Sequence, residues 1–423
     1  MTVGTATGRE PPGPGREFEE PTDRLGDVKL GALRERWSRV LFSGDVPLAL
    51  AAITLVAFVL RLYHATHHDF TGDETPNLQI ADSIRLNPAS PHLVFTSAGH
   101  PLLIVYMAHI GSLLFGQTLV GYRLPMVLIG TLTCWAVYRL GREIGGKAVG
   151  LWAAALLAVD QFHVTGSGSV HVHDIPLIFF GTLALLSCCH ITARGPARPF
   201  VMLGFWMGLA YLGKETALMI WPALWLFFLV SKERRAVLLD PRWYLAHAVR
   251  PDVRGNVMNA SSGGYVEGSL GKALGGGLPF HGKALSLFVG EIVMMFEPGA
   301  YGGQQGYWCW PLRTMNWTAG LVYLVAVPAA WRFRQRPGVV LLGLCFLVTF
   351  AIVTIIPGSP DFWDPFWWAS MATSPAVIMT GLCFAALVGW RRHSLWVLAA
   401  LLGWLLVATT RTLTEVPFSW VTC

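Results

Sequence analysis

The chain has 423 residues, of which 53% are hydrophobic and only 13% charged, and its mean hydropathy is +0.50. This composition excludes a soluble globular protein and predicts an all-α fold, a polytopic transmembrane helical bundle. The formal net charge is +6. In a chain that crosses a membrane repeatedly, the placement of Lys and Arg matters more than their sum, so we expect no nucleic-acid partner.

Residues 1–44 are polar and contain the run PPGPG at Pro11 to Gly15. They lack the apolar segment of a signal peptide, so we expect a cytoplasmic, partly disordered tail. Apolar segments long enough to cross a bilayer follow, about eleven in all by the length rule. They are residues 46–63, 118–138, 148–164, 175–192, 199–213, 216–230, 284–297, 318–331, 339–356, 367–389 and 394–410.

The first outer loop, between the first two spans, contains a shorter apolar segment at residues 101–115. This segment is too short to span a bilayer, and we expect an interfacial helix there. Farther along, residues 231–283 are rich in Gly and Ser, which predicts a flexible cytoplasmic connector loop. It divides an N-terminal catalytic transmembrane block, residues 45–230, from a C-terminal transmembrane block, residues 284–423, expected to form a lipid or acceptor groove.

The distribution of basic residues supports this topology. With the N-terminus inside, 25 of the 31 Lys and Arg residues fall in cytoplasmic segments, as the positive-inside rule requires. The cations left on the outer side are Arg61, Arg85, Arg123, Lys214, Arg313 and Arg411. Each of them stands where an anionic group would need it.

The outer turns contain most of the residues that could perform chemistry. The first loop supplies His67, His68, Asp69, Asp73, Glu74, Arg85 and His100, and later turns supply Arg123, His171, His173, Asp174, Lys214 and Glu215. A carboxylate can remove the proton from an acceptor hydroxyl, and Lys or Arg can stabilise charge on a departing phosphate. These residue types suit glycosyl transfer from a lipid-phosphate-linked sugar at the outer leaflet of a cell membrane.

Six segments between residues 50 and 230 carry a family resemblance. They are the Asp73–Glu74 pair, then GHPLLIVY with LLFG, VGYRLPMVLIGTL, GLWAAALLAV, HDIPLIFF and GLAYLGKETAL. In this order they resemble the GT-C glycosyltransferases, most closely the protein O-mannosyltransferase and aminoarabinose-transferase group. The resemblance implies a polyprenyl-phosphate sugar donor, an inverting displacement and interfacial helices in the first outer loop.

The resemblance also implies roles for individual residues. Asp73 matches the catalytic base and Glu74 its neighbour, and Asp174 matches the acid in the second outer loop. We expect Asp174, together with His171 and His173, to position the acceptor or a metal. Donor phosphate binding is implied for Lys214 and Arg123, and we expect Arg85 and His100 to assist. Relatives usually have an Arg shortly before the second-loop acid, where this chain has His171 and His173.

Several alternatives stay open. Asp73 and Glu74 could cap the helix that follows them. Asp174, His173 and Asp73 could bind a divalent metal such as Mg²⁺ or Mn²⁺, although no cofactor is certain. The acceptor could be a small molecule, a lipid-linked group or a protein. Other classes of function are a transporter or flippase, which would place ionisable residues through the membrane midplane, and a non-catalytic scaffold.

Three further features are expected on the outer side. Cys309 and Cys423 could form a disulfide. Glu291 and Glu297 could line the acceptor groove or snorkel to the interface. The aromatic runs Tyr301 to Trp310 and Asp361 to Trp368 could form an interfacial belt or stack against a sugar, with Asp361 and Asp364 as candidate ligands of its hydroxyls.

Overall fold

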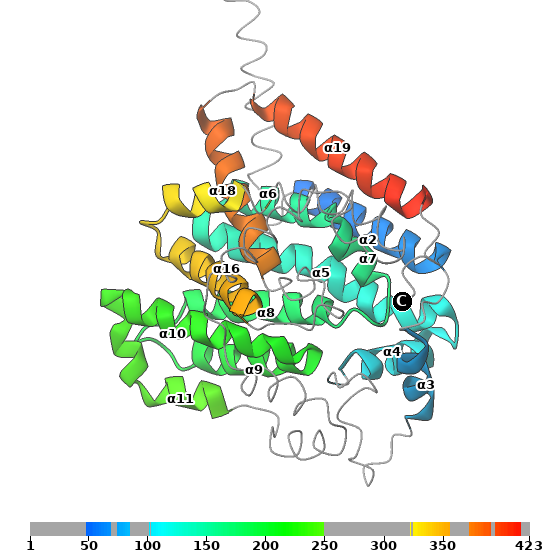
Figure 1. Ribbon diagram of the computed structural model, residues 1–423, viewed down its shortest axis with the longest axis horizontal. Helices are drawn as coiled ribbons and strands as arrows, with labels where there is room; N and C mark the ends of the chain where they lie inside the picture. Colours follow the sequence, from blue (N-terminus) through cyan, green and yellow to red (C-terminus); the bar gives the residue numbers. More distant parts are fainter. Residues whose placement is uncertain are drawn as a thin grey trace, which may run out of the picture. The chain divides into compact units, whose positions relative to one another are not determined.

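The computed structural model describes residues 48–68, 74–84, 101, 103–248, 322, 325–355, 372–390 and 394–415. Over these residues the chain is helical and contains no β-strand, which confirms the all-α prediction. The helices beyond Leu48 belong to one unit, residues 49–423 (Figure 1). Their bounds are α2 Leu48–His67, α3 Glu74–Ser83, α4 Leu103–Phe115, α5 Leu119–Gly145, α6 Lys147–Ala158, α7 Gln161–Ser167, α8 Asp174–Cys189, α9 Arg198–Gly213, η1 Glu215–Met219, α10 Ile220–Val230, η2 Lys232–Leu239, α11 Pro241–Ala248, α16 Pro337–Ile355, α18 Thr373–Trp390 and α19 Ser394–Glu415.

Three of the described helices, α2, α5 and α18, are long and apolar enough to cross a membrane. A fourth span results if α6 and α7, which meet at a bend of 63°, are counted together. Shorter apolar helices accompany them, at Leu103–Phe115, Asp174–Cys189, Thr216–Val230, Pro337–Thr349 and Ser394–Thr410. The multi-helix apolar bundle is therefore confirmed. The count of about eleven spans stays a prediction, because residues 284–297 and part of 318–331 lie outside the described residues.

Two helices, α3 and α4, lie in the described part of the segment between α2 and α5. The apolar segment expected at residues 101–115 forms α4 from Leu103 to Phe115, and Glu74 is the first residue of the shorter helix α3. Helix α4 packs closely on the start of α5: a Cβ on Gly111 would lie 2.7 Å from Cγ of Pro125. Only glycine permits this approach, so α4 is fixed against α5.

Helices α5 and α6 form a tight hairpin. Gly146 turns the chain with a φ of 94°, a value that favours glycine. Farther along the pair, a Cβ on Gly141 would lie 2.9 Å from Cα of Gly150. Small residues at such crossings let membrane helices come into close backbone contact. This hairpin is the framework against which α8 and α18 pack.

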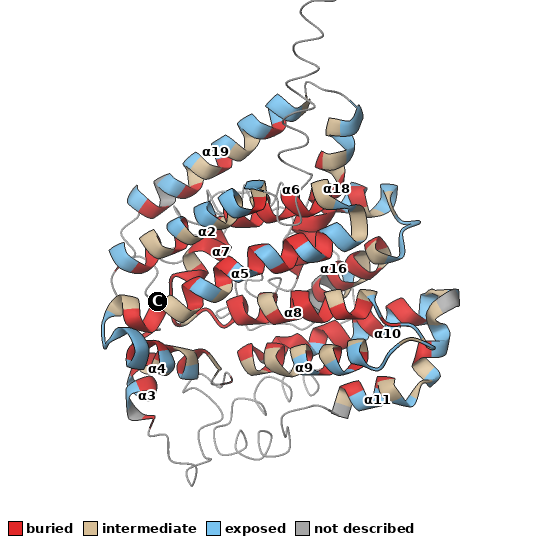
Figure 2. Ribbon diagram, turned by 180° about the vertical axis from the view of Figure 1, so that it is seen from behind, coloured by how far each residue is buried: buried red, intermediate tan, exposed pale blue. Residues whose placement is uncertain are grey.

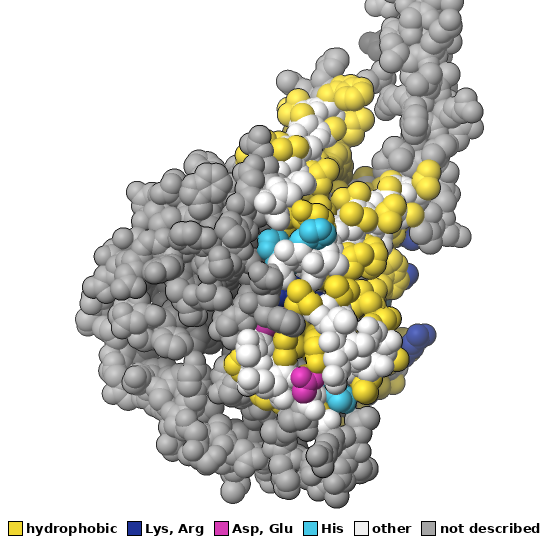
Figure 3. Space-filling view, turned by 90° about the vertical axis from the view of Figure 1, so that its right-hand side faces the viewer, with side chains coloured by type: hydrophobic (Ala, Val, Ile, Leu, Met, Phe, Trp, Pro, Cys, Tyr) yellow, Lys and Arg dark blue, Asp and Glu magenta, His cyan; other side chains and the backbone are white. Residues whose placement is uncertain are grey.

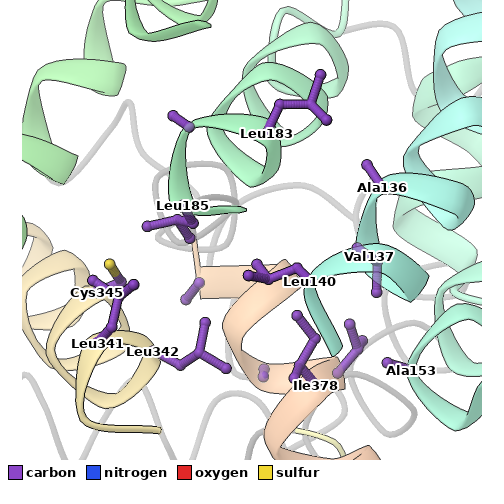
Figure 4. Close-up of a cluster of buried hydrophobic side chains, with 14 of the residues drawn as sticks. Ala136, Val137, Leu140, Ala153, Leu183, Leu185, Leu341, Leu342, Cys345 and Ile378 are labelled. Carbon is purple, nitrogen blue, oxygen red and sulfur yellow. The ribbon is translucent and has the colours of Figure 1, made fainter. Parts of the chain in front are cut away.

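The largest hydrophobic core lies between helices that are far apart in the sequence. Figure 4 shows side chains from α5, α6, α8, α16 and α18 directed into one cluster, among them Ala136, Val137, Leu140, Ala153, Leu183, Leu185, Leu341, Leu342, Cys345 and Ile378. The described parts of the N-terminal and C-terminal blocks therefore share this core. Figure 2 shows α5 and α8 largely buried, whereas much of α19 is exposed.

The exposed surface of the described helices is also apolar. Large hydrophobic side chains such as Leu114, Leu229 and Trp396 are 70%, 53% and 75% exposed. In Figure 3 hydrophobic side chains cover much of the described surface and charged side chains are few. An apolar exterior of this kind suits lipid contact rather than water.

The start of the expected flexible connector is structured. Residues 232–239 form η2 and residues 241–248 form α11. Trp243 of α11 is fully buried, and its ring lies 5.0 Å from that of Phe228 and 5.7 Å from that of Trp221. An aromatic cluster thus holds this segment on α10. The remainder of the predicted connector, from residue 249, lies outside the described residues.

The helices run between two ends that differ in charge. At one end, here called the basic end, His190 Nδ1 lies 3.8 Å from a Glu143 oxygen, and Arg234 Nη1 donates to the Cys189 carbonyl at 3.4 Å. The α5–α6 turn, the end of α8 and η2 therefore meet there. Their neighbourhood contains Arg139, Arg142, Lys147, Arg194, Arg198, Lys232, Arg234, Arg235 and Arg242. Helix α5 has 27 residues, so its first residue lies roughly 40 Å from its last. We call the end of the bundle where α5 begins the site end.

Candidate functional site

A buried ion pair joins the first outer loop to α5 at the site end. Arg123 Nε donates to Glu74 Oε1 at 2.9 Å, and Nη2 donates to Oε2 at 2.5 Å. The two side chains are 1% and 0% exposed. This forked geometry is the one in which Arg binds a carboxylate most strongly. The pair fixes the start of α3, and so the position directly after Asp73, against the bundle.

Arg123 also holds the end of α2. Its Nη1 donates to the carbonyls of His68 at 2.6 Å and Ala65 at 3.1 Å. Carbonyls at a helix C-terminus lack partners within the helix and favour a cation. Together with the bonds to Glu74, these contacts use at least four of the five guanidinium N–H groups. Arg123 therefore connects α2, α3 and α5 at one point.

Glu74 and Asn77 fasten the α7–α8 turn to the same point. The Val170 amide donates to Glu74 Oε1 at 2.7 Å, and Asn77 Nδ2 donates to the Val170 carbonyl at 2.9 Å. Both backbone polar groups of this buried residue are thus satisfied by side chains of α3. As a result, the turn that contains His171 and His173 is fixed relative to Glu74.

The environment of Glu74 favours its ionised form. Burial by itself would raise the pKa of this carboxyl. The hydrogen bonds and charge of Arg123, the charge of His171 and the Val170 amide outweigh burial and hold the pKa below its ordinary value. Glu74 is therefore a carboxylate at neutral pH, as an anchor for Arg123 requires.

A second buried ion pair involves Asp174, four positions after Val170. Lys214 Nζ donates to both oxygens of Asp174 at 2.9 Å. The two residues are 6% and 1% exposed. Asp174 is the first residue of α8, and Lys214 follows the last residue of α9. Close packing supports the pair, since a Cβ on Gly213 would lie 3.1 Å from the Leu177 amide nitrogen.

Histidines surround the two ion pairs. His173 Nδ1 lies 3.3 Å from the Gly213 carbonyl, and Ser169 Oγ lies 2.5 Å from His171 Nδ1. On α2, the rings of His64 and His68 have centroids 4.2 Å apart, and His68 Nε2 lies 3.1 Å from the Leu413 carbonyl of α19. The site end is therefore built from α2, α3, α5, α8, α9 and the end of α19.

The structure places Glu74, Arg123, His171, His173, Asp174 and Lys214 at one end of the bundle, as expected from the topology. It adds Asn77 and His64, for which no role was expected. Asp73, Arg85 and His100 lie outside the described residues, as do Cys309, Cys423, Glu291, Glu297, Asp361 and Asp364.

The expected metal ligands were tested against this geometry. Within the described part of the chain, no three His, Cys, Asp or Glu side chains come together in a group that could hold a metal ion. Asp174 is bound to Lys214 through both oxygens, and His173 Nδ1 faces a carbonyl. These two residues alone do not make a metal site, and the third expected ligand, Asp73, is not among those described.

The structural roles of two charged residues in the apolar segments, Arg61 and Asp160, were not expected from the sequence. Arg61 of α2 had been counted as an outer cation, but it is 0% exposed and lies against the break between α6 and α7. Asp160 lies at that break and accepts from the His163 amide. A charged residue within an apolar run is the signal that could have identified both.

Comparison with known families agrees with this fold. Residues 99–250 match the dolichyl-phosphate-mannose-protein mannosyltransferase family. A curated relative, the polyprenol-phosphate-mannose–protein mannosyltransferase of Corynebacterium glutamicum, is 32% identical over 20% of this chain and 16% of its own length. Another, undecaprenyl phosphate-α-4-amino-4-deoxy-L-arabinose arabinosyl transferase 1 of Pseudomonas fluorescens, is 28% identical over 49% of this chain and 41% of its own. The matches span less than half of either relative.

Solved structures show a similar fold. ArnT from Cupriavidus metallidurans, bound to undecaprenyl phosphate, superposes with a TM-score of 0.55 at 15% identity, over 81% of this chain and 61% of that one. The oligosaccharyltransferase AglB from Archaeoglobus fulgidus, in complex with an inhibitory peptide and a dolichol-phosphate, gives a TM-score of 0.58 at 14% identity, over 86% and 55%. In sequence and in fold, this chain resembles the GT-C glycosyltransferases of the protein mannosyltransferase and aminoarabinose-transferase group.

Proposed function

We propose that the chain is an integral membrane glycosyltransferase that transfers a sugar from a polyprenyl-phosphate-linked donor to a hydroxyl acceptor at the non-cytoplasmic face. The mannosyl and arabinosyl transferases that it resembles support this reaction class. The sugar, a hexose or a pentose, and the acceptor are left open.

The observation that carries the proposal is the convergence of two buried carboxylate–cation pairs on one end of an apolar bundle. Glu74–Arg123 and Lys214–Asp174 come from four separate segments, and the α7–α8 turn connects them. Desolvated pairs are costly to bury unless geometry and additional hydrogen bonds compensate. Such preorganised charge suits a reaction in which a phosphate leaves with developing negative charge.

The charge distribution supports the proposed orientation. The cations at the basic end include exposed Arg139, Arg142, Arg194 and Arg198, whereas Arg123 and Lys214 at the site end are buried in ion pairs. Exposed Lys and Arg concentrate on the cytoplasmic side of membrane proteins. The site end then faces the opposite side of a multi-pass protein.

The proposed chemistry is a single displacement with inversion. The acceptor oxygen attacks the anomeric carbon as the Asp73 carboxylate takes the hydroxyl proton. The bond between that carbon and the phosphate oxygen breaks, and polyprenyl phosphate leaves with the bonding electrons. Glu74, held by Arg123, fixes the chain directly after Asp73. We therefore propose that Arg123 supports the base through Glu74 instead of contacting the donor phosphate.

Lys214 is the proposed ligand of the donor phosphate, and Asp174 orients its ammonium group through two hydrogen bonds of 2.9 Å. His171 and His173 lie on the adjoining turn and are proposed to position the acceptor, while Arg85 and His100 remain proposed contributors to phosphate binding. No step in this scheme requires a metal.

Donor consumption tests the proposal directly. The full chain in nanodiscs is mixed with a panel of polyprenyl-phosphate sugars and with hydroxyl acceptors, including a Ser/Thr peptide, and released polyprenyl phosphate is measured. Wild type and a control at the exposed Asp82, Asp82→Asn, should release it, and Asp73→Asn should lose activity by about 10²-fold or more. Equal release by Asp73→Asn would overturn the assignment of the base. Absence of release with every donor and acceptor would contradict the transferase proposal and favour a transporter or scaffold.

A further inference from the structure

The α7–α8 turn of the candidate site is carried by a broken helix. Helices α6 and α7 meet at a bend of 63° within one apolar segment. In a continuous helix the carbonyls of residues 157, 158 and 159 would accept from the amides of residues 161, 162 and 163. Within a membrane such a break persists only where other groups satisfy the released backbone.

Both halves of the interrupted hydrogen bond between Val159 and His163 have new partners. The Val159 carbonyl accepts from Thr409 Oγ1 of α19 at 2.6 Å. The His163 amide donates to Asp160 Oδ1 at 2.8 Å, so that Asp160 forms the N-cap of α7. Thr409 is 1% exposed. A side chain of α19 therefore supplies the hydrogen bond that the break removes from the Val159 carbonyl.

Arg61 donates to the other two carbonyls, of which the Leu157 carbonyl also accepts from the Asp160 amide at 3.3 Å. Its Nη2 donates to the Leu157 carbonyl at 3.2 Å, and its Nη1 donates to the Ala158 carbonyl at 3.3 Å. A charge inside a membrane bundle is costly and usually has a specific partner. Here the partner is the C-terminal end of α6, where helix carbonyls attract a cation.

The guanidinium of Arg61 also contacts α7. Arg61 Nη2 lies 2.8 Å from His163 Nδ1, and Ser167 Oγ, at the end of α7, donates to the His163 carbonyl. A Cβ on Gly168, the next residue, would lie 3.1 Å from the Ala65 amide nitrogen of α2. Contacts from Arg61 and Thr409 thus lead without interruption to the turn that contains Val170 and Asp174.

We infer that Arg61 and Thr409 are positioning residues for the candidate site. They fix the angle between α6 and α7 and thereby set where the Val170–Asp174 turn meets Glu74 and Lys214. This inference rests on the proposed glycosyl transfer for its catalytic part. Its structural part, that these two side chains order the turn, stands independently of that reaction.

The test uses substitutions on adjacent threonines. Thr409→Val removes the hydroxyl that reaches Val159 and keeps the side-chain shape, and Thr409→Ser restores the hydroxyl. The control is Thr410→Val, because Thr410 is exposed and its hydroxyl bonds only within α19, to the Leu406 carbonyl at 2.8 Å. Arg61→Lys tests the second residue, since it keeps the charge but loses the forked donors.

Hydrogen–deuterium exchange of the full chain in nanodiscs gives the first readout. Exchange of amides 161–175 should accelerate about fivefold to tenfold in Thr409→Val and Arg61→Lys, corresponding to loss of one net hydrogen bond. Exchange in residues 337–349 of α16 should stay unchanged. Thr409→Ser and Thr410→Val should match wild type. Exchange equal to wild type in both Thr409→Val and Arg61→Lys would overturn the inference, whatever the activity of the chain.

Steady-state kinetics gives the second readout. Because a small misplacement of reacting groups is expensive, Thr409→Val should lower kcat about tenfold or more with the donor KM changed less than about threefold. Thr409→Ser should recover the rate. Faster exchange with an unchanged kcat would overturn the positioning role. A wild-type chain without transferase activity would instead refute the proposed function, while the exchange experiment would still decide whether Arg61 and Thr409 order the turn.

Discussion

Glu74 and Arg123 are 49 positions apart and form two hydrogen bonds of 2.9 and 2.5 Å in a fully buried site. Each needs the other as its partner, because an unpaired ion buried in this environment would be strongly destabilising. The pair also holds Val170, through its amide, and the end of α2, through the carbonyls of Ala65 and His68. It is the point where the first outer loop becomes part of the bundle.

Removing one member of this pair should destabilise the protein strongly. Glu74→Ala leaves the Arg123 guanidinium buried without its carboxylate, and the expected loss is about 3–5 kcal/mol. Chemical denaturation in detergent, followed by tryptophan fluorescence, measures it. Asp82→Asn is the control, since Asp82 is exposed and accepts one bond from Tyr122 at 2.6 Å. The double variant Glu74→Ala/Arg123→Met should lose less than the sum of the single changes; additive losses would contradict the pairing.

The stability that Glu74 contributes should depend on pH with a defined sign. Its pKa is lowered in the folded protein from an ordinary value of 4.5, so the folded state favours the carboxylate. The contribution is complete above pH 4.5 and is lost as the pH falls through the lowered folded-state pKa. The measurement is the difference in unfolding free energy between wild type and Glu74→Gln from pH 7 to pH 3. A difference that grows toward acid pH would show that the sign is wrong.

Lys214 and Asp174 should affect activity as a unit. If Lys214 stabilises the departing phosphate, Lys214→Met should lower kcat/KM about 10²- to 10³-fold, whereas Lys232→Met at the basic end should have little effect. Because both Asp174 oxygens contact Lys214 at 2.9 Å, Asp174→Asn combined with Lys214→Met should cost little more than Lys214→Met alone. Initial rates over a range of donor concentrations decide this. Fully additive effects would mean that Asp174 acts independently of Lys214.

The hairpin of α5 and α6 should tolerate no side chain at its crossing. A Cβ on Gly150 would meet the Tyr138 carbonyl, which is backbone and cannot move aside. Gly150→Ala should therefore destabilise the bundle by about 1–3 kcal/mol. Gly403→Ala in α19 is the matched control, because a Cβ there has nothing within 4 Å. It should be neutral or stabilising by up to about 1 kcal/mol in a helix interior. Thermal unfolding of the two variants in one detergent compares them.

The sequence by itself determined the class of protein and the order of its elements. Apolar runs predicted α2, α5 and α18, because a membrane span can be recognised from the length and composition of one continuous segment. The short segment that became α4 was also predicted, as was the grouping of Glu74, Arg123, Asp174 and Lys214 at one end of the bundle. Successive membrane spans run in opposite directions, so alternate turns lie at the same end of the bundle. The alternation of basic turns with turns that contain acidic residues was therefore enough to separate the basic end from the site end.

Only the tertiary structure decided which charges become partners. Arg61 reaches carbonyls 96 and 97 positions away, and Lys214 meets Asp174 across 40 positions. These pairings depend on which helices become neighbours and on how closely glycines such as Gly130 and Gly213 let them approach. Hydrophobic periodicity contains no such information. A break in a helix, with the carbonyls it releases, likewise becomes recognisable only when the groups that satisfy those carbonyls are seen in place, because they come from α2 and α19, far away in the sequence.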